Sequence, residues 1–374
     1  MLAAERRSRI IAQARRSGAV RVTDIAGALG VSEATVRRDL DSLVADGLLD
    51  KVYGGATLST AGPVTAAIQV GVVIPAATAY YPRILDGIRD RADDPDAGLT
   101  VNLALSRRGT DPTLESIVGS ERELIGGLIE SGVNGLLLLP ALGSRQQHNA
   151  AVREYEAWLS ELPVPAVLME RELPSMFLDG PSSIRTAHER GAAGAVRHLS
   201  ELGHRRIALL ARTDTQTAEL VHHGWQHAIA ELDLPADVPF LAGKSALDWP
   251  GWSTADLDLI LDQLRDQEVT GLLCHSDEDA LTLLRHARAR GVDVPGDLSV
   301  VAYEDELAAL AHPALTAVAP PRRQVGQLAV QILLGLINDQ ARDTVSHLTL
   351  DPQLITRSST SRLLVDLDDS IGAD

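Results

Sequence analysis

The stretch VTDIAGALGVSEATVRRDLDSLVADG, residues 22–47, decides the fold of the N-terminal region. Its apolar spacing predicts two short helices that are joined by a tight glycine turn. We expect Thr23 to cap the first helix, Gly30 to end it, and Ser32 to cap the second. The stretch therefore predicts a helix-turn-helix.

The second of these helices has two distinct faces. Four apolar residues follow the i, i+4, i+7, i+8 spacing of one buried stripe, namely Val36, Leu40, Leu43 and Val44. The outward arc holds Ala34, Thr35, Arg37, Arg38 and Asp41. Such a face fits the major groove of DNA, where arginine contacts phosphates or pairs with guanine. The alternative is that Arg37 and Arg38 are ordinary solvated arginines of a protein-docking module.

The flanking sequence completes a small winged domain. Residues 5–18, ERRSRIIAQARRSG, predict a preceding helix that stops at Gly18. Residues 48–58, LLDKVYGGATL, form an apolar run that turns at Gly54 and Gly55, as a β-hairpin wing would. Three helices and a wing are thus the expected fold of residues 1–58.

Charge is unevenly distributed along the chain. The formal net charge is −17, yet residues 1–58 carry nine Lys and Arg against seven Asp and Glu. The remaining residues carry 25 Lys and Arg against 44 Asp and Glu. A locally basic head on an acidic body suits DNA binding through the head alone, because the body repels phosphate. The excess of positive charge in the head is small, so charge alone does not decide the matter.

Composition predicts a soluble cytoplasmic protein without a membrane segment. The chain has 374 residues, of which 45% are hydrophobic and 23% charged, as expected for two or three globular domains. Its single cysteine, Cys274, excludes an intrachain disulfide, and its apolar strand context predicts burial. Arginines interrupt any signal-peptide core, and no run approaches the ~18–20 apolar residues that span a bilayer.

After a linker, the pattern changes to alternating strands and helices. The linker, STAGPVTAA at residues 59–67, is small and uncharged and contains Gly and Pro. Strand-length apolar runs then recur: IQVGVVI, LTVNLAL, VNGLLLL, PAVLME, RRIALLA, TGLLCH and LSVVAYE. Helical stretches separate most of them. The predicted fold class is α/β, with parallel sheets in two lobes. Residues 363–374 are expected to be an acidic, frayed tail.

The head resembles a known family of DNA-binding domains. Residues 7–56 are similar nearly end to end to the winged helix-turn-helix of the deoxyribose-operon-repressor (DeoR) type, most specifically in SEATVRRDL at 32–40 and YGGA at 53–56. The resemblance implies DNA contacts from six residues: Ser32, Thr35, Arg37, Arg38, Lys51 and Tyr53. Thr23 is a further candidate because backbone N–H groups at a helix amino end can meet a phosphate.

The body resembles the effector domain of the lactose-repressor (LacI) family, which has the two-lobed periplasmic-binding-protein fold. The likeness covers residues 68–362. It is carried by VGVVIPAATAYYPRILDGI, ESGVNGLLLLPA, HLSELGHRRIALL and SDEDALTLLRHARARGVDVPGDLSVVAYEDELAALAHPALTAV. The linker departs from the family, because STAGPVTAA does not resemble the hinge helix that usually follows a LacI-type head. Effector binding is therefore expected to be relayed differently.

The LacI resemblance implies an effector site between the lobes, where ligands of open α/β sheets bind. By position it is expected to contain Tyr80, Tyr81, Arg171, His188, Trp249, Ser276, Asp277 and Glu304. Tyr80 and Tyr81 match an aromatic pair of the family. Arg171 matches a ligand-gripping arginine, and Glu304 an acid that binds sugar hydroxyls.

Several of these residues have a structural alternative. Tyr80 or Tyr81 can pack between the lobes. Asp277 follows a strand and precedes a helix, so we favour a helix cap over a ligand contact. Glu304 and Arg171 can form an ion pair across the cleft.

The four tryptophans fall into two groups. Trp249 and Trp252 are candidates for stacking on a sugar, although loop packing is the favoured role of Trp249. Trp158 and Trp225 lie within helical stretches and are expected in the core.

No catalytic or metal-binding pattern stands out. The chain lacks Gly-x-Ser-x-Gly, His-Glu-x-x-His and a dinucleotide-binding fingerprint. His223 and His227 are four residues apart, but no third ligand lies near them in sequence. We therefore expect no enzyme, no cofactor and no metal. The competing hypotheses are a solute-binding protein and a sugar- or sugar-phosphate-acting enzyme, each with an accessory N-terminal domain.

Taken together, these patterns predict a homodimeric transcription regulator, a repressor of carbohydrate-metabolism genes. The expected divisions are a DNA-binding domain at 1–58, a linker at 59–67, an effector domain at 68–362 and a tail at 363–374. Paired heads bind double-stranded operator DNA of approximate two-fold symmetry. A small sugar-like effector closes the cleft and changes the affinity for DNA.

Overall fold

The computed structural model divides the chain into two compact units. One contains Met1–Gln69 with Asp94–Thr100, and the other contains Val70–Asp93 with Val101–Asp374. The structure describes residues 6, 7, 9, 10, 13, 14, 18–45, 49–58, 68–75, 80–94, 97–106, 114–141, 150–171, 180–212, 215–242, 252–338 and 344–363. We call residues up to 58 the head and the second unit the body. The linker predicted at 59–67, and the predicted tail beyond residue 363, lie outside the described residues.

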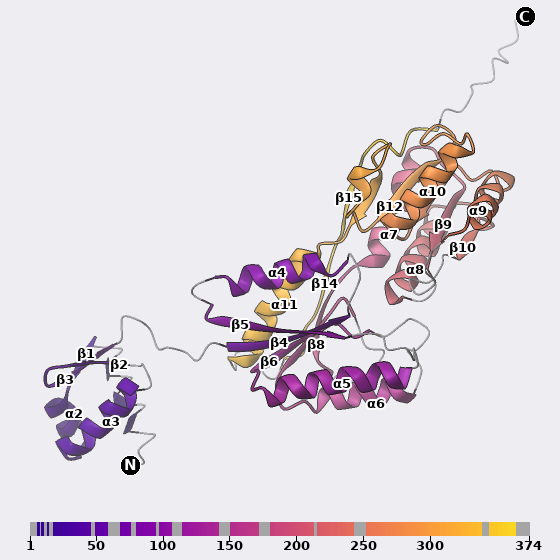
Figure 1. The fold of residues 1–374 in the computed structure, drawn as a ribbon. Coiled ribbons are helices and arrows are strands. Elements are labelled where there is room, and N and C mark those ends of the chain that lie inside the picture. Colours follow the sequence, from indigo (N-terminus) through magenta and orange to yellow (C-terminus); the bar gives the residue numbers. More distant parts are fainter. Residues whose placement is uncertain are drawn as a thin grey trace, which may run out of the picture. The chain divides into compact units, whose positions relative to one another are not determined.

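The head is a helix-turn-helix with a small antiparallel sheet (Figure 1). Its two bounded helices are α2 (Val22–Leu29) and α3 (Glu33–Ala45), and residues 6, 7, 9, 10, 13 and 14 are also helical. Strands β1 (Ala19–Arg21), β2 (Leu49–Val52) and β3 (Gly55–Leu58) pair in the order β1-β3-β2. The predicted wing is thus the β2–β3 hairpin, and β1 adds a third strand to it.

A single apolar cluster holds the head together. Its buried members are Ile10, Ala14, Val20, Val22, Ile25, Val36, Leu40, Leu43, Leu49 and Ala56. The predicted α3 stripe supplies three of them, while Val44 is partly buried against the cluster. Gly30 ends α2 with φ 64°, a left-handed conformation that glycine adopts without strain. This turn sets the entry of α3.

The body contains two six-stranded sheets, one in each lobe (Figure 1). In the first lobe the order is β14 (His347–Leu350), β8 (Ser182–Thr186), β7 (Ala166–Met169), β6 (Gly135–Leu138), β4 (Ile68–Pro75), β5 (Leu99–Ser106). In the second it is β10 (Phe240–Ala242), β9 (Ile207–Ala211), β11 (Gly271–Cys274), β12 (Ser299–Tyr303), β13 (Thr316–Ala319), β15 (Gln353–Ile355). The strands from β14 to β4 and from β10 to β13 are parallel, and β15 is antiparallel to β13.

Helices cover both faces of the first-lobe sheet (Figure 1). One face carries α4 (Pro82–Ala92) and α11 (Arg322–Ile337), and the other α5 (Leu114–Glu130) and α6 (Ala150–Ser160). Helices α4 and α11 cross closely through Gly87 and Gly326. A Cβ on Gly87 would lie 2.0 Å from the Arg323 carbonyl oxygen, and one on Gly326 would lie 2.1 Å from that of Ile84. No larger residue fits at either position without separating the two helices.

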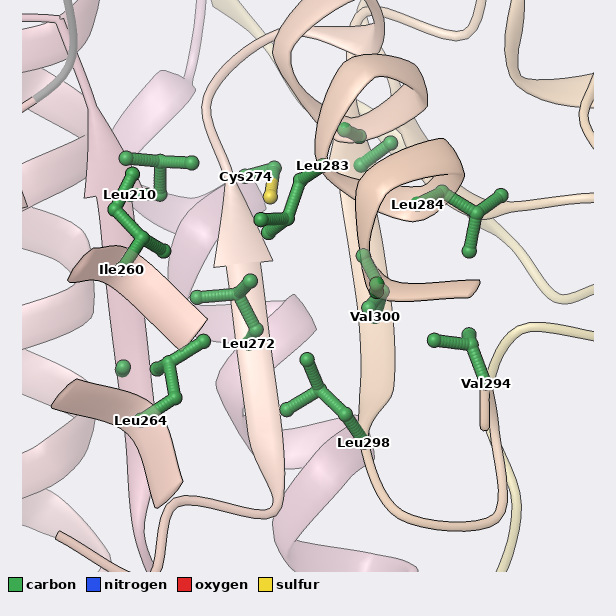
Figure 2. Close-up of a cluster of buried hydrophobic side chains, with 14 of the residues drawn as sticks. Leu210, Ile260, Leu264, Leu272, Cys274, Leu283, Leu284, Val294, Leu298 and Val300 are labelled. Carbon is green, nitrogen blue, oxygen red and sulfur yellow. The ribbon is translucent and has the colours of Figure 1, made fainter. Parts of the chain in front are cut away.

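The second lobe repeats this layered arrangement. Helices α7 (His188–Glu201) and α8 (Gln216–Glu231) pack against one face of its sheet, and α9 (Thr254–Asp266) and α10 (Asp277–Ala289) against the other. Figure 2 shows the core beneath α9 and α10, where Cys274 lies among leucine side chains. Cys274 is buried and unpaired with another cysteine, as its apolar strand context predicts. In the described part of the chain, no helix has the length and apolar character to cross a membrane.

The chain passes between the lobes three times. The passages run from β8 to α7, from β13 to α11, and from β14 to β15. Each lobe is therefore assembled from separate parts of the sequence. The parallel strands of both lobes end near these passages, which positions the residues that follow them at the junction of the lobes.

Candidate functional site

The outward face of α3 carries most of the residues expected to meet DNA. Ser32, Arg37 and Arg38 are exposed, and Thr35 is half-buried beside them. Ser32 caps the helix as predicted, because its Oγ accepts a hydrogen bond from the Thr35 backbone N–H at 3.3 Å. Tyr53, at the turn of the wing, is fully exposed.

Two of these cations form ion pairs with acids of the head. Arg37 Nη2 lies 3.2 Å from Glu33 Oε2, and Lys51 Nζ lies 2.6 Å from Asp41 Oδ1. The Lys51 pair links wing strand β2 to α3. All four side chains are at least half exposed, so these pairs contribute little to stability.

The predicted cap at Thr23 is wrong. Helix α2 begins at Val22, with Arg21 in the cap position and no side-chain cap bond. The Thr23 hydroxyl donates to Asp24 Oδ1 at 3.1 Å instead. Pairing of β1 with β3 explains the shift, because it carries the chain in extended form to Arg21, and Val22 N–H then donates to the Gly54 carbonyl at 3.0 Å.

In the body, unpartnered polar atoms gather at the ends of strands. Eight described residues hold buried side-chain nitrogen or oxygen atoms that lack a hydrogen-bond partner. All except Arg122 end a strand or follow one within five residues: Tyr80, Ser106, Arg171, Arg212, His275, Asp277 and Arg322. We call these seven the strand-end groups. Burying a polar atom without a hydrogen bond costs free energy. The occurrence of such atoms after the ends of strands in both sheets therefore indicates a site for a polar ligand.

A buried chain of hydrogen bonds links the two lobes. The Glu170 carboxylate, after β7, accepts from the Thr186 N–H (3.1 Å) and hydroxyl (2.8 Å) and bonds His188 Nε2 at 3.2 Å. His188 Nδ1 bonds the Tyr303 hydroxyl of β12 at 2.9 Å. Burial opposes ionisation of Glu170, but the hydrogen bonds from His188 and Thr186 and the charge of His188 together lower its pKa. Since both nitrogens of His188 are engaged, its ring is held at the passage from β8 to α7.

Ser276 and Asp277, which follow β11, have different roles. Ser276, not Asp277, caps α10: its Oγ accepts from the Asp279 N–H at 3.1 Å. The helix cap predicted for Asp277 is therefore wrong by one residue, because α10 already begins at Asp277. Asp277 Oδ2 instead accepts from the backbone N–H groups of residues 306–308 at 2.6, 2.7 and 3.2 Å. Its Oδ1 is a strand-end atom without a partner.

Glu304 lies at the end of β12 beside a cavity. The cavity has a volume of about 460 Å³ and is lined by Glu304 and Arg322, among others. Burial, and then repulsion by Asp277, raises the pKa of Glu304 to about 8 against the opposing charges of Arg322 and Arg212. Its carboxyl group is therefore mostly protonated at neutral pH.

Arg322 occupies the centre of this junction. Only 4% of it is exposed, and its Nη2 donates to the Glu304 carbonyl and pairs with Glu306 Oε1, both at 2.6 Å. Arg83, at the start of α4, also contacts the Glu306 carboxylate at 3.3 Å. Nε and Nη1 of Arg322 have no partner. One arginine thus contacts both lobes at the passage into α11.

The predicted aromatic pair is present but partly covered. The rings of Tyr80 and Tyr81 are 5.8 Å apart and nearly perpendicular, at 82°. The Arg322 guanidinium lies 4.8 Å from the centroid of the Tyr80 ring. The Tyr80 hydroxyl is buried without a partner, and burial raises its pKa well above the usual value. One face of the pair therefore meets a cation rather than open space.

Arg171 lies at the expected place after β7. Its Nη1 donates to the Glu170 carbonyl at 2.8 Å, and its Nε has no partner. The ion pair considered between Arg171 and Glu304 is not the arrangement seen, because the arginine against Glu304 is Arg322.

The structure shows the surroundings of Trp225 and Trp252 but does not describe Trp249. Trp249 lies outside the described residues. Trp252 packs against the second-lobe core, and its Nε1 donates to Asp279 Oδ1 at 2.8 Å. Trp225 is buried as predicted and donates to the Ile207 carbonyl at 3.0 Å.

Arg212 and His275 of the second lobe were not among the residues predicted from the sequence. His275 is buried beside Tyr303, neither ring nitrogen has a partner, and burial together with the charge of Arg212 lowers its pKa to about 3. Arg212 Nε lies 3.6 Å from Asp279 without forming a hydrogen bond. The available signal was positional, because each is the first polar residue after an apolar strand.

Comparison with known families matches both parts of the chain. Residues 6–61 match the DeoR-like helix-turn-helix domain. Residues 196–360 match the periplasmic binding protein-like domain. The match to the second family thus begins within α7.

Curated relatives match nearly the whole chain. An HTH-type transcriptional regulator in the aml 5' region of Streptomyces limosus is 33% identical over 363 residues, which is 91% of this chain and 95% of the relative. The arabinose metabolism transcriptional repressor of Geobacillus stearothermophilus is 25% identical over 353 residues, covering 91% and 90%.

A solved structure shares the fold of the body. It is the lac repressor dimer bound to operator and the anti-inducer ONPF. The similarity has a TM-score of 0.63 at 25% identity and covers 79% of this chain and 95% of that one.

Proposed function

Since the chain belongs to the HTH-type transcriptional regulators, with a DeoR-like helix-turn-helix and a LacI-type periplasmic-binding-protein-like domain, we propose that it represses carbohydrate-metabolism genes under the control of a sugar-like effector. The proposed division is a DNA-binding domain at 1–58, a linker at 59–67, an effector domain at 68–362 and a tail at 363–374. The protein is a DNA-binding transcription regulator and not an enzyme, in keeping with its relatives.

In this proposal the head binds double-stranded operator DNA through α3 and the wing. The exposed face of α3, with Arg37 and Arg38, enters the major groove, while Lys51 and Tyr53 of the wing contact the flanking backbone. Ser32 and Thr23 lie near the amino ends of α3 and α2, where backbone N–H groups can meet phosphates. The weak ion pairs of Arg37 and Lys51 leave both cations available for DNA.

One observation carries the effector proposal. Seven strand-end groups from both lobes leave buried polar atoms unsatisfied where the parallel strands end. A ligand that bonds these atoms recovers part of the cost of their burial. We assign Tyr80, Tyr81, Arg171, Asp277 and Glu304 to this site, and Trp249 by its sequence position. Ser276 and His188 act as supports, because their polar side-chain atoms are already bonded.

The effector controls DNA binding by changing the angle between the lobes. The buried Glu170–His188–Tyr303 chain and the Arg322 contacts both lie at passages between the lobes, so ligand contacts with either lobe bias this angle. A homodimer places two heads on a two-fold symmetric operator. The solved lac repressor relative is a dimer on its operator, which supports this assembly.

A gel-shift titration tests the proposal. Purified full-length protein is titrated onto DNA upstream of its own and adjacent genes, with and without a panel of pentoses, hexoses and disaccharides that includes arabinose and cellobiose. Retention of one upstream fragment over scrambled DNA, and a change of its affinity with one sugar class, is the expected result. Equal affinity for every fragment, with and without each compound, would refute it.

A further inference from the structure

We propose that the effector carries an anionic oxygen group, a phosphate ester or a carboxylate, on its sugar-like skeleton. This inference rests on the proposed function and concerns the same strand-end site. Its basis is the chemistry of the atoms left unpartnered there, which is dominated by arginine.

Donors outnumber acceptors among these atoms. Four guanidinium nitrogens lack a partner: Nε of Arg171, Nε of Arg212, and both Nε and Nη1 of Arg322. Among the same strand-end groups, one carboxylate oxygen lacks a partner, Oδ1 of Asp277. The hydroxyls of Tyr80 and Ser106 and the His275 ring can both donate and accept. Guanidinium groups are permanently charged and only donate, so their best partner is an anionic oxygen.

Three described aromatic residues near the strand ends already have a ring face or polar group engaged by protein atoms. The Tyr80 ring is covered on one face by the Arg322 guanidinium. Tyr303 is fully buried in the hydrogen-bonded chain. Trp252 packs against the core with its N–H bonded to Asp279. The Tyr80 ring, a candidate for stacking on a neutral sugar, thus already has the Arg322 guanidinium over one face.

Nearby acids form ion pairs with Arg212 and Arg322 but leave guanidinium N–H donors without a hydrogen bond. Glu304 is mostly protonated at neutral pH. Asp277 Oδ2 is satisfied by three backbone N–H groups. Arg212 lies 3.5 and 3.6 Å from Glu278 and Asp279, distances that leave its Nε without a hydrogen bond. Arg322 shares the Glu306 carboxylate with Arg83, so one acid serves two cations.

The three arginines come from different parts of the body. Arg171 follows β7 of the first lobe, Arg212 follows β9 of the second, and Arg322 begins α11 at a passage between them. An anion with several acceptor oxygens can bond donors from both lobes at once. Its binding then favours a particular angle between the lobes, as the proposed regulation requires.

Thermal-shift measurements on the full chain with matched compounds test the inference. Glucose is compared with glucose 6-phosphate and glucuronate, arabinose with arabinose 5-phosphate and arabinonate, and inorganic phosphate with chloride at equal ionic strength. We expect an anionic member to raise the melting temperature by more than about 2 °C where its neutral parent does not. The phosphate and carboxylate arms distinguish the two sources of the anion.

Variants locate the binding. Arg212→Met is expected to weaken the affinity of the shifting compound roughly tenfold or more, and Arg212→Lys by less. Arg122→Met is the matched control, because Arg122 also has a buried unpartnered Nε but lies on α5 and not at a strand end. Retained affinity in both Arg212 variants, or an equal loss in Arg122→Met, would overturn the assignment.

Failure of this inference can be told apart from failure of the proposed function. Equal shifts with a neutral sugar and its anionic forms overturn the anionic effector but leave a sugar-controlled repressor. If no compound, inorganic phosphate included, stabilises wild type more than Arg212→Met, the anionic site is also overturned. Loss of specific operator binding in the gel shift refutes the regulator itself, whatever the thermal shifts show.

Discussion

The candidate DNA-contacting cations of the head and the candidate effector site of the body differ in how their charged groups are paired. In the head, the Arg37–Glu33 and Lys51–Asp41 pairs lie in solvent, with exposed fractions of 51–71%. In the body, the Glu170–His188 pair is almost fully enclosed, and each strand-end group has at least one buried polar atom without a hydrogen bond. The head therefore has cations that exchange partners at little cost, while the body has polar atoms that only a fitted partner satisfies. The exposed cations of the head suit binding to a long polyanion, and the buried polar atoms of the body suit binding to a small molecule.

The largest effect is expected from breaking the buried pair. Glu170→Ala leaves His188 and both Thr186 donors without their acceptor, so the free energy of unfolding of the body should fall by about 3–5 kcal/mol. Urea denaturation measures it, and the loss should be similar at low and high salt. Glu231→Ala removes an exposed acid as the control. A loss no greater than that of the control would contradict the enclosed role of Glu170.

Removing the exposed cations of α3 should have the next largest effect, on DNA binding and not on folding. Combined Arg37→Ala and Arg38→Ala should weaken operator binding about 100-fold or more, since each such contact is worth roughly 1–3 kcal/mol. Fluorescence anisotropy at several salt concentrations measures the affinity and its salt dependence. The unfolding midpoint should stay unchanged. Arg265→Ala, which removes an exposed arginine of α9, serves as the control. Undiminished affinity in the double variant would exclude α3 as the DNA-binding helix.

A change of pH should separate the two regions further. Because folding raises the pKa of Glu304 from 4.5 to about 8, its stabilising contribution is complete below pH 4.5 and is lost as pH rises through 8. Between about pH 5 and pH 8, wild type should lose stability relative to Glu304→Gln by at most about 1.4 kcal/mol per pH unit, and above pH 8 the difference should level off. Urea denaturation across this range checks it. Parallel pH profiles of the two proteins would argue against the raised pKa.

The smallest effect is expected for the exposed pair of the wing. A double-mutant cycle with Lys51→Met and Asp41→Asn should give a coupling energy below about 1 kcal/mol that fades in high salt. The same cycle on Glu170 and His188 should give a larger coupling that persists in high salt. Equal salt sensitivity in the two cycles would remove the distinction between head and body.

The sequence predicted the strands with a long continuous apolar run buried on both faces, namely β4, β6, β7, β9, β11 and β12. It missed β8, SSIRT, although four of its five residues are buried. Its hydroxyl groups are bonded inside the lobe: Ser183 Oγ to His347 Nδ1 at 2.8 Å, and Thr186 Oγ1 to Glu170 at 2.8 Å. A strand that is buried through hydrogen bonds has no hydrophobic pattern to reveal it.

The position of several candidate site residues relative to the strands was predictable, whereas their use as an effector site stays a prediction. Tyr80, Arg171, Asp277 and Glu304 lie at strand ends, as the resemblance implied. Which guanidinium nitrogens of an arginine are bonded depends on residues distant in sequence, so the unbonded Nε and Nη1 of Arg322 have no local signal. The left-handed backbone of Glu304, with φ 102°, is likewise absent from any sequence pattern.

The three passages between the lobes determine the order in which the protein can be completed. During synthesis from the amino end, the head is finished at β3, whereas the first lobe awaits β14 and the second awaits β15, both beyond residue 346. During translation, all strands and helices described for the head are therefore synthesised long before either lobe of the body has its last strand. A chain cut near residue 340 would contain every strand and helix described for the head but would lack one strand from each lobe of the body.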